Sequence, residues 1–370
     1  MSKLQQAHEI GQSIWLDFID RAFLDSGGLK DLVDDGLRGV TSNPSIFEKA
    51  ISKGDEYDED IARLVAEGKS DSEIYEALAI ADIQQAADVL RPVYDQSGGA
   101  DGFVSLEVNP ELAYDTGETI KEARHLFKTV DRPNVMIKVP ATAAGIPAIA
   151  TLTGEGININ ITLMFSLTHY DAVADAYIRG LERLLASGGD VSKVSSVASF
   201  FVSRVDSEVD EQLAENGSDE AKALLGTIGI ANSKLAYTRY LNAFSSERWG
   251  RLAAQGARPQ RILYGSTSTK NPDYPDTLYV DGLMGPSTVN TLPLDTIDAM
   301  RERGTISPAL TTNLDEARQQ LVQLDLLGID LEEITQQLQD VGVIKFADSF
   351  RELMGSIRQA SESLKAAAPA

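Results

Sequence analysis

The chain has 370 residues, of which 43% are hydrophobic and 24% are charged. This composition is typical of a globular protein and excludes a disordered or fibrous chain. Acidic residues outnumber basic ones by 56 to 33, so the net charge of −23 disfavours binding to nucleic acid or to an anionic membrane. An anionic substrate would need a few well-placed cations to overcome this field. The absence of cysteine excludes disulfides, thiol catalysis and cysteine-based zinc sites.

The first 30 residues carry three acidic side chains, Glu9, Asp17 and Asp20, and no long apolar stretch. We therefore expect no signal peptide. No window of the sequence approaches the ~18 apolar residues that a membrane-spanning helix needs. The sequence thus predicts a soluble protein of the cytoplasm, with neither membrane nor nucleic acid among its partners.

Short apolar runs of strand length recur along the chain, and most are β-branched or aromatic and flanked by Gly, Pro, Asp or Asn. The runs cover residues 13–19, 39–42, 102–108, 135–141, 159–165, 194–202, 261–268 and 277–284. Stretches with helical periodicity separate them, which predicts a parallel sheet. With about eight strand–helix units, the simplest architecture is a (β/α)8 barrel of the TIM type. A doubly wound open sheet is the alternative.

The helical stretches between the runs carry recognisable start signals. Ser70 and Glu73 have the spacing of a capping box, and Asp115 and Glu118 mark a second helix start. A third helix is expected to begin at Thr168. Residues 206–260 exceed one crossover helix and predict two or three helices. Residues 313–370 are also expected to be helical, with Leu331, Ile334, Leu338 and Val341 on one face. We expect one domain over residues 1–370, with a helical insertion at about 206–260 and a helical C-terminal extension at about 313–370.

Lys138 is the most informative single position, because it lies within the apolar run VMIKVPA at residues 135–141. Strand alternation places Val135, Ile137 and Val139 on one face and Met136 with Lys138 on the other. Lysine is rarely buried without a partner, so an ion-paired lysine at a barrel end is one interpretation. The other is a nucleophile that forms a Schiff base. Such an amine must be uncharged to attack a carbonyl, and burial disfavours the ammonium form.

Polar side chains also occur at the ends of other candidate strands. They include Asp17, Thr41, Ser42, Asn43, Glu107, Asn160, Thr162 and Ser199. Each has a structural explanation by itself: a carboxylate can be ion-paired, and Asn43-Pro44 is a turn signal. Together they indicate a site, because barrel enzymes build their active sites at the C-terminal ends of the strands. Two carboxylates near one amine are also what the proton transfers of imine chemistry require.

Arg204 follows the sixth run, and Lys270 follows the seventh within the hydroxyl-rich loop GSTSTKNP at residues 265–272. Barrels often bind phosphate near their last strands, and Arg204 and Lys270 with Ser266 and Ser268 would suit one. Solvated loop cations are the alternative. The three histidines have no metal-ligand spacing, and no nucleotide-binding loop is present, so we expect neither a metal nor a cofactor.

The segment GVTSNPSIFEKAI at residues 39–51 resembles a signature of the transaldolases, and VMIKVPAT at 135–142 resembles the segment around their Schiff-base lysine. INITLMFS at 159–166 and ASFFVSRVD at 198–206 are similar to the fifth and sixth strands of that family. The resemblance runs in order from Asp17 to about Lys270. The length of the chain and the helical insertion resemble the longer bacterial branch. The sixth-strand motif departs from the family at Phe200 and Ser203, where Pro and Gly are common.

The resemblance implies a (β/α)8 barrel that moves a dihydroxyacetone unit from sedoheptulose 7-phosphate or fructose 6-phosphate to glyceraldehyde 3-phosphate or erythrose 4-phosphate. In that reading, Lys138 forms the imine, Asp17 is the acid–base in carbon–carbon cleavage, and Glu107 with Thr162 holds the catalytic water. Contacts to the sugar are implied for Asn43, Asn160 and Ser199. Phosphate binding is implied for Arg204, Ser268 and Lys270. Many relatives have Arg at position 270, and Lys cannot make the same bidentate contact with phosphate.

Two other functions compete with this one. An aldolase could use the same lysine but release free dihydroxyacetone or another small carbonyl compound. A sugar-phosphate-binding protein could keep the barrel without turnover, although the joint presence of Lys138, Asp17 and Glu107 speaks against it. The sequence does not distinguish a monomer from a homodimer.

Overall fold

Parallel strands close into a barrel at the centre of this computed structural model, which describes residues 1–53 and 55–367. The strands of the described chain are β1 (Gln12–Leu16), β2 (Gly39–Thr41), β3 (Phe103–Glu107), β4 (Val135–Pro140), β5 (Ile159–Met164), β6 (Ser196–Phe201), β7 (Arg261–Gly265) and β8 (Thr288–Leu292). They pair in sequence order, and β8 closes the barrel on β1 with Gln12 opposite Thr288. This confirms the predicted TIM-type fold.

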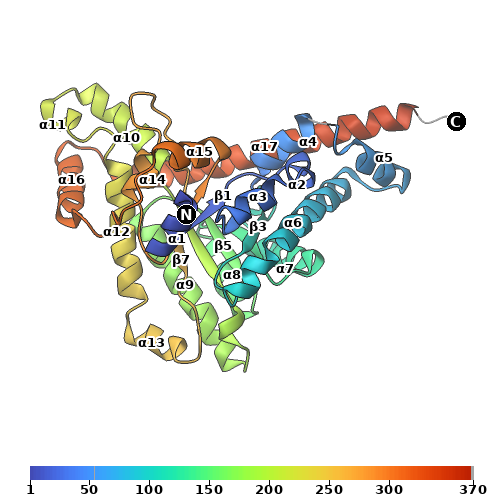
Figure 1. Ribbon diagram of the computed structural model, residues 1–370, viewed down its shortest axis with the longest axis horizontal. Coiled ribbons are helices and arrows are strands. Elements are labelled where there is room, and N and C mark those ends of the chain that lie inside the picture. Colours follow the sequence, from blue (N-terminus) through green and yellow to red (C-terminus); the bar gives the residue numbers. More distant parts are fainter. Residues whose placement is uncertain (54, 368–370) are drawn as a thin grey trace.

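Helices surround the barrel and extend beyond it at both ends (Figure 1). The helices of the N-terminal half are α1 (Lys3–Ile10), α2 (Arg21–Asp25), α3 (Gly28–Asp34), α4 (Pro44–Lys53), α5 (Asp58–Ala66), α6 (Asp71–Gln96), α7 (Thr116–Val130), α8 (Gly145–Gly154) and α9 (Leu167–Ala186). The C-terminal half adds α10 (Ser203–Asn216), α11 (Asp219–Lys222), α12 (Ile228–Ala243), α13 (Glu247–Ala253), α14 (Leu278–Gly282), α15 (Leu294–Arg303), α16 (Leu314–Leu326) and α17 (Leu331–Ala367). Short 3₁₀ turns cover Pro110–Leu112 and Val191–Lys193. Across the described residues, no helix has both the length and the hydropathy to cross a bilayer.

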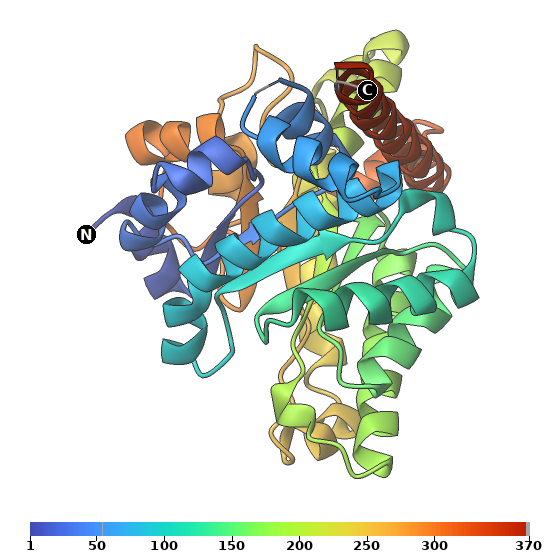
Figure 2. The ribbon, with the colours of Figure 1, turned by 90° about the vertical axis from the view of Figure 1, so that its right-hand side faces the viewer.

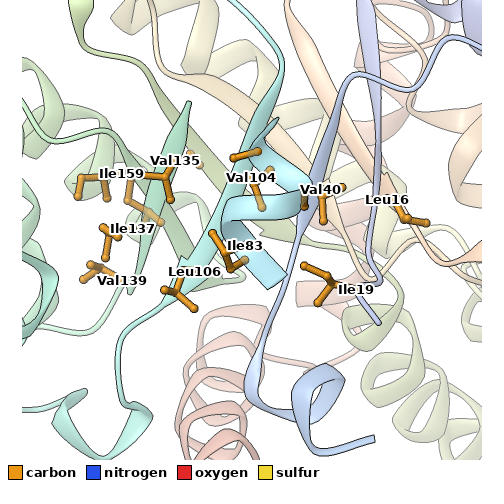
Figure 3. Close-up of a cluster of buried hydrophobic side chains, with 14 of the residues drawn as sticks. Leu16, Ile19, Val40, Ile83, Val104, Leu106, Val135, Ile137, Val139 and Ile159 are labelled. Carbon is orange, nitrogen blue, oxygen red and sulfur yellow. The ribbon is translucent and has the colours of Figure 1, made fainter. Parts of the chain in front are cut away.

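The strand side chains divide between two buried layers. Those that point outward pack against the helices, as Figure 3 shows for Ile83 of α6 beside Leu106 and Val104 of β3. Those that point inward form a separate cluster that fills the barrel and includes Trp15, Phe103 and Met136. Because both faces are buried, the strands of a parallel barrel appear in the sequence as nearly continuous apolar runs. Met136 lies in the inner cluster and Val135, Ile137 and Val139 in the outer one, which confirms the predicted alternation along β4.

The last predicted strand was wrong. Residues 277–284 contain the helix α14, in which Tyr279 and Val280 are buried, and the eighth strand is Thr288–Leu292 instead. A short apolar run suits a buried helix as well as a buried strand, so its composition could not decide. The true strand has the sequence TVNTL, and its polar residues broke the apolar pattern on which the prediction relied.

The helix start signals were largely correct. Ser70 caps α6 in a capping box with Glu73, and Asp115 caps α7 by accepting a hydrogen bond from the Glu118 amide. The helix expected from Thr168 begins at Leu167 and is capped by Ser166. The face predicted for α17 was wrong at Val341, which is 44% exposed, because the buried stripe continues through Val343 and Phe346.

Helix α17 lies across the end of the barrel where the strands finish. Both views place it beside α4 and near α10 (Figure 1, Figure 2). The amide of Gln339 donates hydrogen bonds to the carbonyl oxygens of Ala141 at 3.1 Å and Leu163 at 2.9 Å, close to the ends of β4 and β5. The described C-terminal helix is therefore attached to the strand ends where a barrel builds its site.

Candidate active site

A cavity of about 400 Å³ opens at the C-terminal ends of the strands. Its walls come from the ends of six strands or the loops that follow them, from α4 and from Phe346 of α17. This volume lies in the range that small-molecule sites usually occupy. We call it the main pocket.

Lys138 lies at the inner end of the main pocket and is 4% exposed. Its Nζ lies 3.1 Å from Glu107 Oε2 and donates a hydrogen bond to the Ser42 carbonyl oxygen at 3.1 Å. The strand register explains this pairing, because Lys138 on β4 is directly opposite Glu107 on β3. The Phe346 ring covers the amine, with its centroid 5.7 Å from Nζ. A buried amine with one carboxylate partner and an aromatic cover is therefore what the barrel presents to the pocket.

Glu107 is buried behind Lys138 and does not line the main pocket. Burial raises the pKa of the Glu107 carboxyl, and the neighbouring charge of Lys138 opposes that rise only in part. A carboxyl group with a raised pKa holds a proton more readily than an ordinary carboxylate, and can take one up and give it back as acid–base catalysis requires.

Asp17 is the second carboxylate near the amine, and it faces the main pocket directly. It comes immediately after β1, which ends at Leu16, so the strand is shorter than the apolar run at residues 13–19. Its Oδ1 accepts a hydrogen bond from Thr41 Oγ1 at 2.7 Å. Thr41 is in turn 2.7 Å from the hydroxyl of Thr291 on β8. This chain of hydroxyls fixes the carboxylate at the pocket wall.

The three polar residues predicted on β5 and β6 are all buried, and two of them are hydrogen bonded to each other. Ser199 lines the main pocket, and its hydroxyl donates to Asn160 Oδ1 at 2.7 Å. Asn160 does not reach the pocket wall and donates instead to Ser105 Oγ at 3.0 Å. Thr162 is fully buried, and its hydroxyl has no hydrogen-bond partner among the described residues. An unpartnered buried hydroxyl of this kind usually binds an ordered water.

Asn43 lines the main pocket at the start of α4, where its Oδ1 accepts a hydrogen bond from the Ile46 amide at 3.0 Å. Its Nδ2 group makes no hydrogen bond to any other residue that the structure describes and is available to a ligand. The helix start that follows the TSNP segment thus positions this side chain.

Three cations surround the main pocket: Arg204, Lys270 and Lys49. Within the described part of the chain, no carboxylate lies within 4.0 Å of any of them. Burial lowers the pKa of both Arg204 and Lys270, and Lys270 also feels the charges of Arg204 and Lys49. Lys270 Nζ donates to Ser268 Oγ at 2.7 Å. Cations that lack acidic partners in so acidic a protein are suited to an anion such as phosphate.

The sequence did not identify several residues of the pocket wall. Thr291 was missed because its strand was missed. Lys49 lies on α4, nearly two turns after Asn43, and was not selected although it is within the segment 39–51. Phe346 had no sequence signal, because it comes from a helix about 200 residues after Lys138 and only the tertiary packing brings the two together. Among the described residues, no three His, Asp or Glu side chains are grouped as a metal site would need.

Comparisons with known proteins show which family the chain belongs to. The family model described as Transaldolase/Fructose-6-phosphate aldolase matches residues 14–357. A transaldolase of Parafrankia sp. (strain EAN1pec) is 49% identical over 362 residues, which cover 97% of this chain and 98% of that protein. Transaldolases of Thermobifida fusca, 49% identical, and Thiobacillus denitrificans, 48% identical, cover 97% and 96% of this chain and 98% and 100% of their own lengths. The chain therefore belongs to the transaldolase/fructose-6-phosphate aldolase family.

Proposed function

We propose that this chain catalyses the transaldolase reaction through an imine on Lys138. The enzyme takes a dihydroxyacetone unit from sedoheptulose 7-phosphate or fructose 6-phosphate and passes it to glyceraldehyde 3-phosphate or erythrose 4-phosphate. The observation that carries the proposal is the buried Lys138 amine, 3.1 Å from the Glu107 carboxylate, at the inner end of a pocket with cations around it. Holding the unit covalently divides one difficult exchange into two easier steps.

The first step is attack of the Lys138 amine on the ketone carbon of the donor sugar. The product is a carbinolamine, which must lose its hydroxyl as water to become the protonated imine. Glu107 carries the two protons that the ketone oxygen takes up as it leaves as water: one comes from the Lys138 ammonium before the attack, and one from the carbinolamine nitrogen after it. Thr162, whose buried hydroxyl has no protein partner among the described residues, holds the water together with Glu107.

The second step is cleavage of the carbon–carbon bond. Asp17 takes the proton from the sugar hydroxyl next to that bond, the aldose phosphate leaves, and the electron pair moves into the protonated imine to give an enamine. Because the imine is the electron sink, the step calls for no cofactor. The enamine then attacks the acceptor aldehyde, and the same groups act in reverse order.

The rest of the pocket binds and orients the sugar. Arg204, Lys270 and Ser268 bind the phosphate at the outer end. Asn43, Ser199 and, through Ser199, Asn160 hold the hydroxyls of the dihydroxyacetone unit. Lys49 adds a charge on the phosphate side, so the local field attracts an anion that the whole molecule repels.

Borohydride trapping tests the role of Lys138. Reduction in the presence of fructose 6-phosphate should add the mass of the reduced donor to the peptide that contains Lys138. The Lys138→Ala variant should form no adduct and show no activity. Lys270→Ala is the matched control, since it removes another lysine of the same pocket and should still form the adduct at saturating substrate. An adduct that maps to a different lysine would refute the assignment.

Product analysis separates the transferase from an aldolase with the same lysine. A transaldolase needs an acceptor aldehyde for turnover, whereas an aldolase would release free dihydroxyacetone without one. We expect little dihydroxyacetone from fructose 6-phosphate alone, and rapid transfer of the three-carbon unit when labelled erythrose 4-phosphate is added as the acceptor. The proposal includes a cytoplasmic location, which the lack of cysteine allows.

A further inference from the structure

A second cavity lies on the far side of the Lys138–Glu107 ion pair. Its volume is about 110 Å³, and it lies between β3, α6, α7 and α17. Lys138 lines the main pocket but not this cavity, whereas Glu107 lines this cavity but not the main pocket. The ion pair therefore separates two spaces. We call the second one the rear cavity.

The rear cavity reaches from Glu107 to the surface of the protein. Glu107 is only 7% exposed at the inner end. At the outer end Ser72 is exposed, and the side chain of Glu76 is 37% exposed. Its volume is enough for several water molecules. The space thus connects the buried carboxylate with solvent without passing through the main pocket.

The walls of the rear cavity carry polar groups that water can bind. The hydroxyl of Tyr75 makes no hydrogen bond within the described part of the chain, and burial raises its pKa, as do the carboxylates of Glu122, Glu107 and Glu76. Glu122 accepts one hydrogen bond, from the Asn109 amide at 3.0 Å, and burial raises its pKa as well. Tyr75 and Glu122 are half-buried, and water in the cavity can complete their hydrogen bonds.

The proposed chemistry at Lys138 releases one water for each imine that forms. An ammonium and a ketone give a protonated imine and one water: the carbon–oxygen bond breaks, a carbon–nitrogen bond forms, and no proton is gained or lost overall. While the imine exists, the sugar phosphate lies between Lys138 and the mouth of the main pocket. Water leaving through that mouth would have to pass the bound substrate.

We propose that the rear cavity is the port through which water leaves Glu107 when the imine forms and returns when it is hydrolysed. The inference rests on the proposed function, because it assumes the imine on Lys138. Tyr75 is a positioning residue of this port: its hydroxyl binds the water that passes, and its ring packs edge-on against Phe350 of α17 at 5.4 Å. Water then leaves and returns through the rear cavity, whereas the substrate enters and leaves through the main pocket.

The test follows the oxygen atom of the ketone. Fructose 6-phosphate labelled with ¹⁸O at C2 is incubated with the enzyme in the absence of an acceptor. The label that remains in the recovered sugar is then measured. It is compared with the number of imines formed, which borohydride trapping counts. The Ala79→Leu variant fills the rear cavity from α6. Ala77→Leu is its control, since Ala77 lies on the same helix and does not line the cavity. Tyr75→Phe keeps the wall and removes only the hydroxyl.

In the wild type we expect label to be lost with nearly every imine formed. Ala79→Leu should return labelled oxygen to the sugar severalfold more often, Tyr75→Phe less strongly in the same direction, and Ala77→Leu should match the wild type. If Ala79→Leu does not fold, Tyr75→Phe decides alone. If the folded variants lose the label as fast as the wild type and still form the borohydride adduct on Lys138, the rear port is refuted and the proposed function is not. A wild-type enzyme that traps no adduct at Lys138 refutes the proposed function, and the port with it.

Discussion

In the proposed mechanism, Asp17 acts only after the imine on Lys138 has formed. It faces the main pocket and is held by Thr41, whereas the Lys138 amine is paired with Glu107. We therefore expect Asp17→Ala to lower turnover by about 10²–10⁴-fold, the usual contribution of an acid–base group, and to leave the borohydride adduct on Lys138 intact. Quench-flow turnover and trapping on the same preparation check this. Loss of the adduct in a variant with a wild-type circular dichroism spectrum would contradict the role given to Asp17.

Arg204 and Lys270 carry the predicted phosphate contact at the outer end of the pocket. Hydrogen bonds to a charged group contribute about 1.5–3 kcal/mol, so Arg204→Gln should raise KM for fructose 6-phosphate by roughly 10–100-fold. For unphosphorylated fructose the change in KM should be small. Steady-state kinetics with both sugars make the comparison. A similar loss for both sugars would mean that Arg204 supports the fold of the pocket and does not bind phosphate.

The effect of Lys at position 270 can be tested by replacing it with the Arg that many relatives have there. Lys270→Arg restores a planar group with paired donors, and we expect it to bind phosphate at least as tightly as the wild type. Inhibition by inorganic phosphate measures this without turnover. Weaker inhibition would show that the local geometry around Ser268 is adapted to the lysine.

At the scale of elements, a buried amide helps to hold α17 over the end of the barrel, beside the apolar side chains of the same helix. Gln339 is 3% exposed and bonds two strand-end carbonyls, those of Ala141 and Leu163. Gln339→Leu leaves both carbonyls without this donor, and we expect the free energy of unfolding to fall by about 2 kcal/mol. Activity should fall too, because Phe346 on the same helix covers Lys138. Urea unfolding measures the stability, with Gln337→Leu on the exposed side of α17 as the control.

At the scale of the whole molecule, the buried carboxyl groups and the net charge both make the folded state more stable as the pH is lowered towards 5.5. Burial raises the pKa of Asp206 to about 6, although the Gly229 amide donates a hydrogen bond to it, and burial also raises the pKa of Glu107 and Glu122. A carboxyl with a raised folded-state pKa contributes stability that is complete below its ordinary pKa and is lost as the pH rises through the folded value. Lower pH also reduces the repulsion that comes from a net charge of −23.

We therefore expect the melting temperature to be higher near pH 5.5 than near pH 8. It should fall again at strongly acidic pH, because the Ser70 backbone amide holds the pKa of Glu73 at about 2, and that stability disappears when Glu73 is protonated. For Asp206 the shift from 3.8 to about 6 corresponds to roughly 3 kcal/mol at most. Asp206→Asn should remove this share of the pH dependence, as melting curves of both proteins across this range would show. Parallel curves for the two proteins would contradict the assignment.

The sequence by itself determined the barrel and the positions of the polar residues that follow most of its strands. Strands buried on both faces leave apolar runs of fixed length, and a lysine such as Lys138 inside one of them is conspicuous because burying a charge is costly. Seven of the strands and the residues at their ends could be located in this way. The eighth strand could not, since the polar side chains of TVNTL gave no apolar run while the helix at 278–282 gave one.

Only the tertiary structure decided which polar residues share a space. Glu107 and Lys138 are 31 positions apart and become neighbours through strand register, while Phe346 reaches Lys138 because α17 crosses the barrel end. Local sequence encodes the direction of a side chain within its own strand or helix. Which two elements meet depends on packing over the whole chain, and so the division between the main pocket and the rear cavity was visible only after the chain had folded.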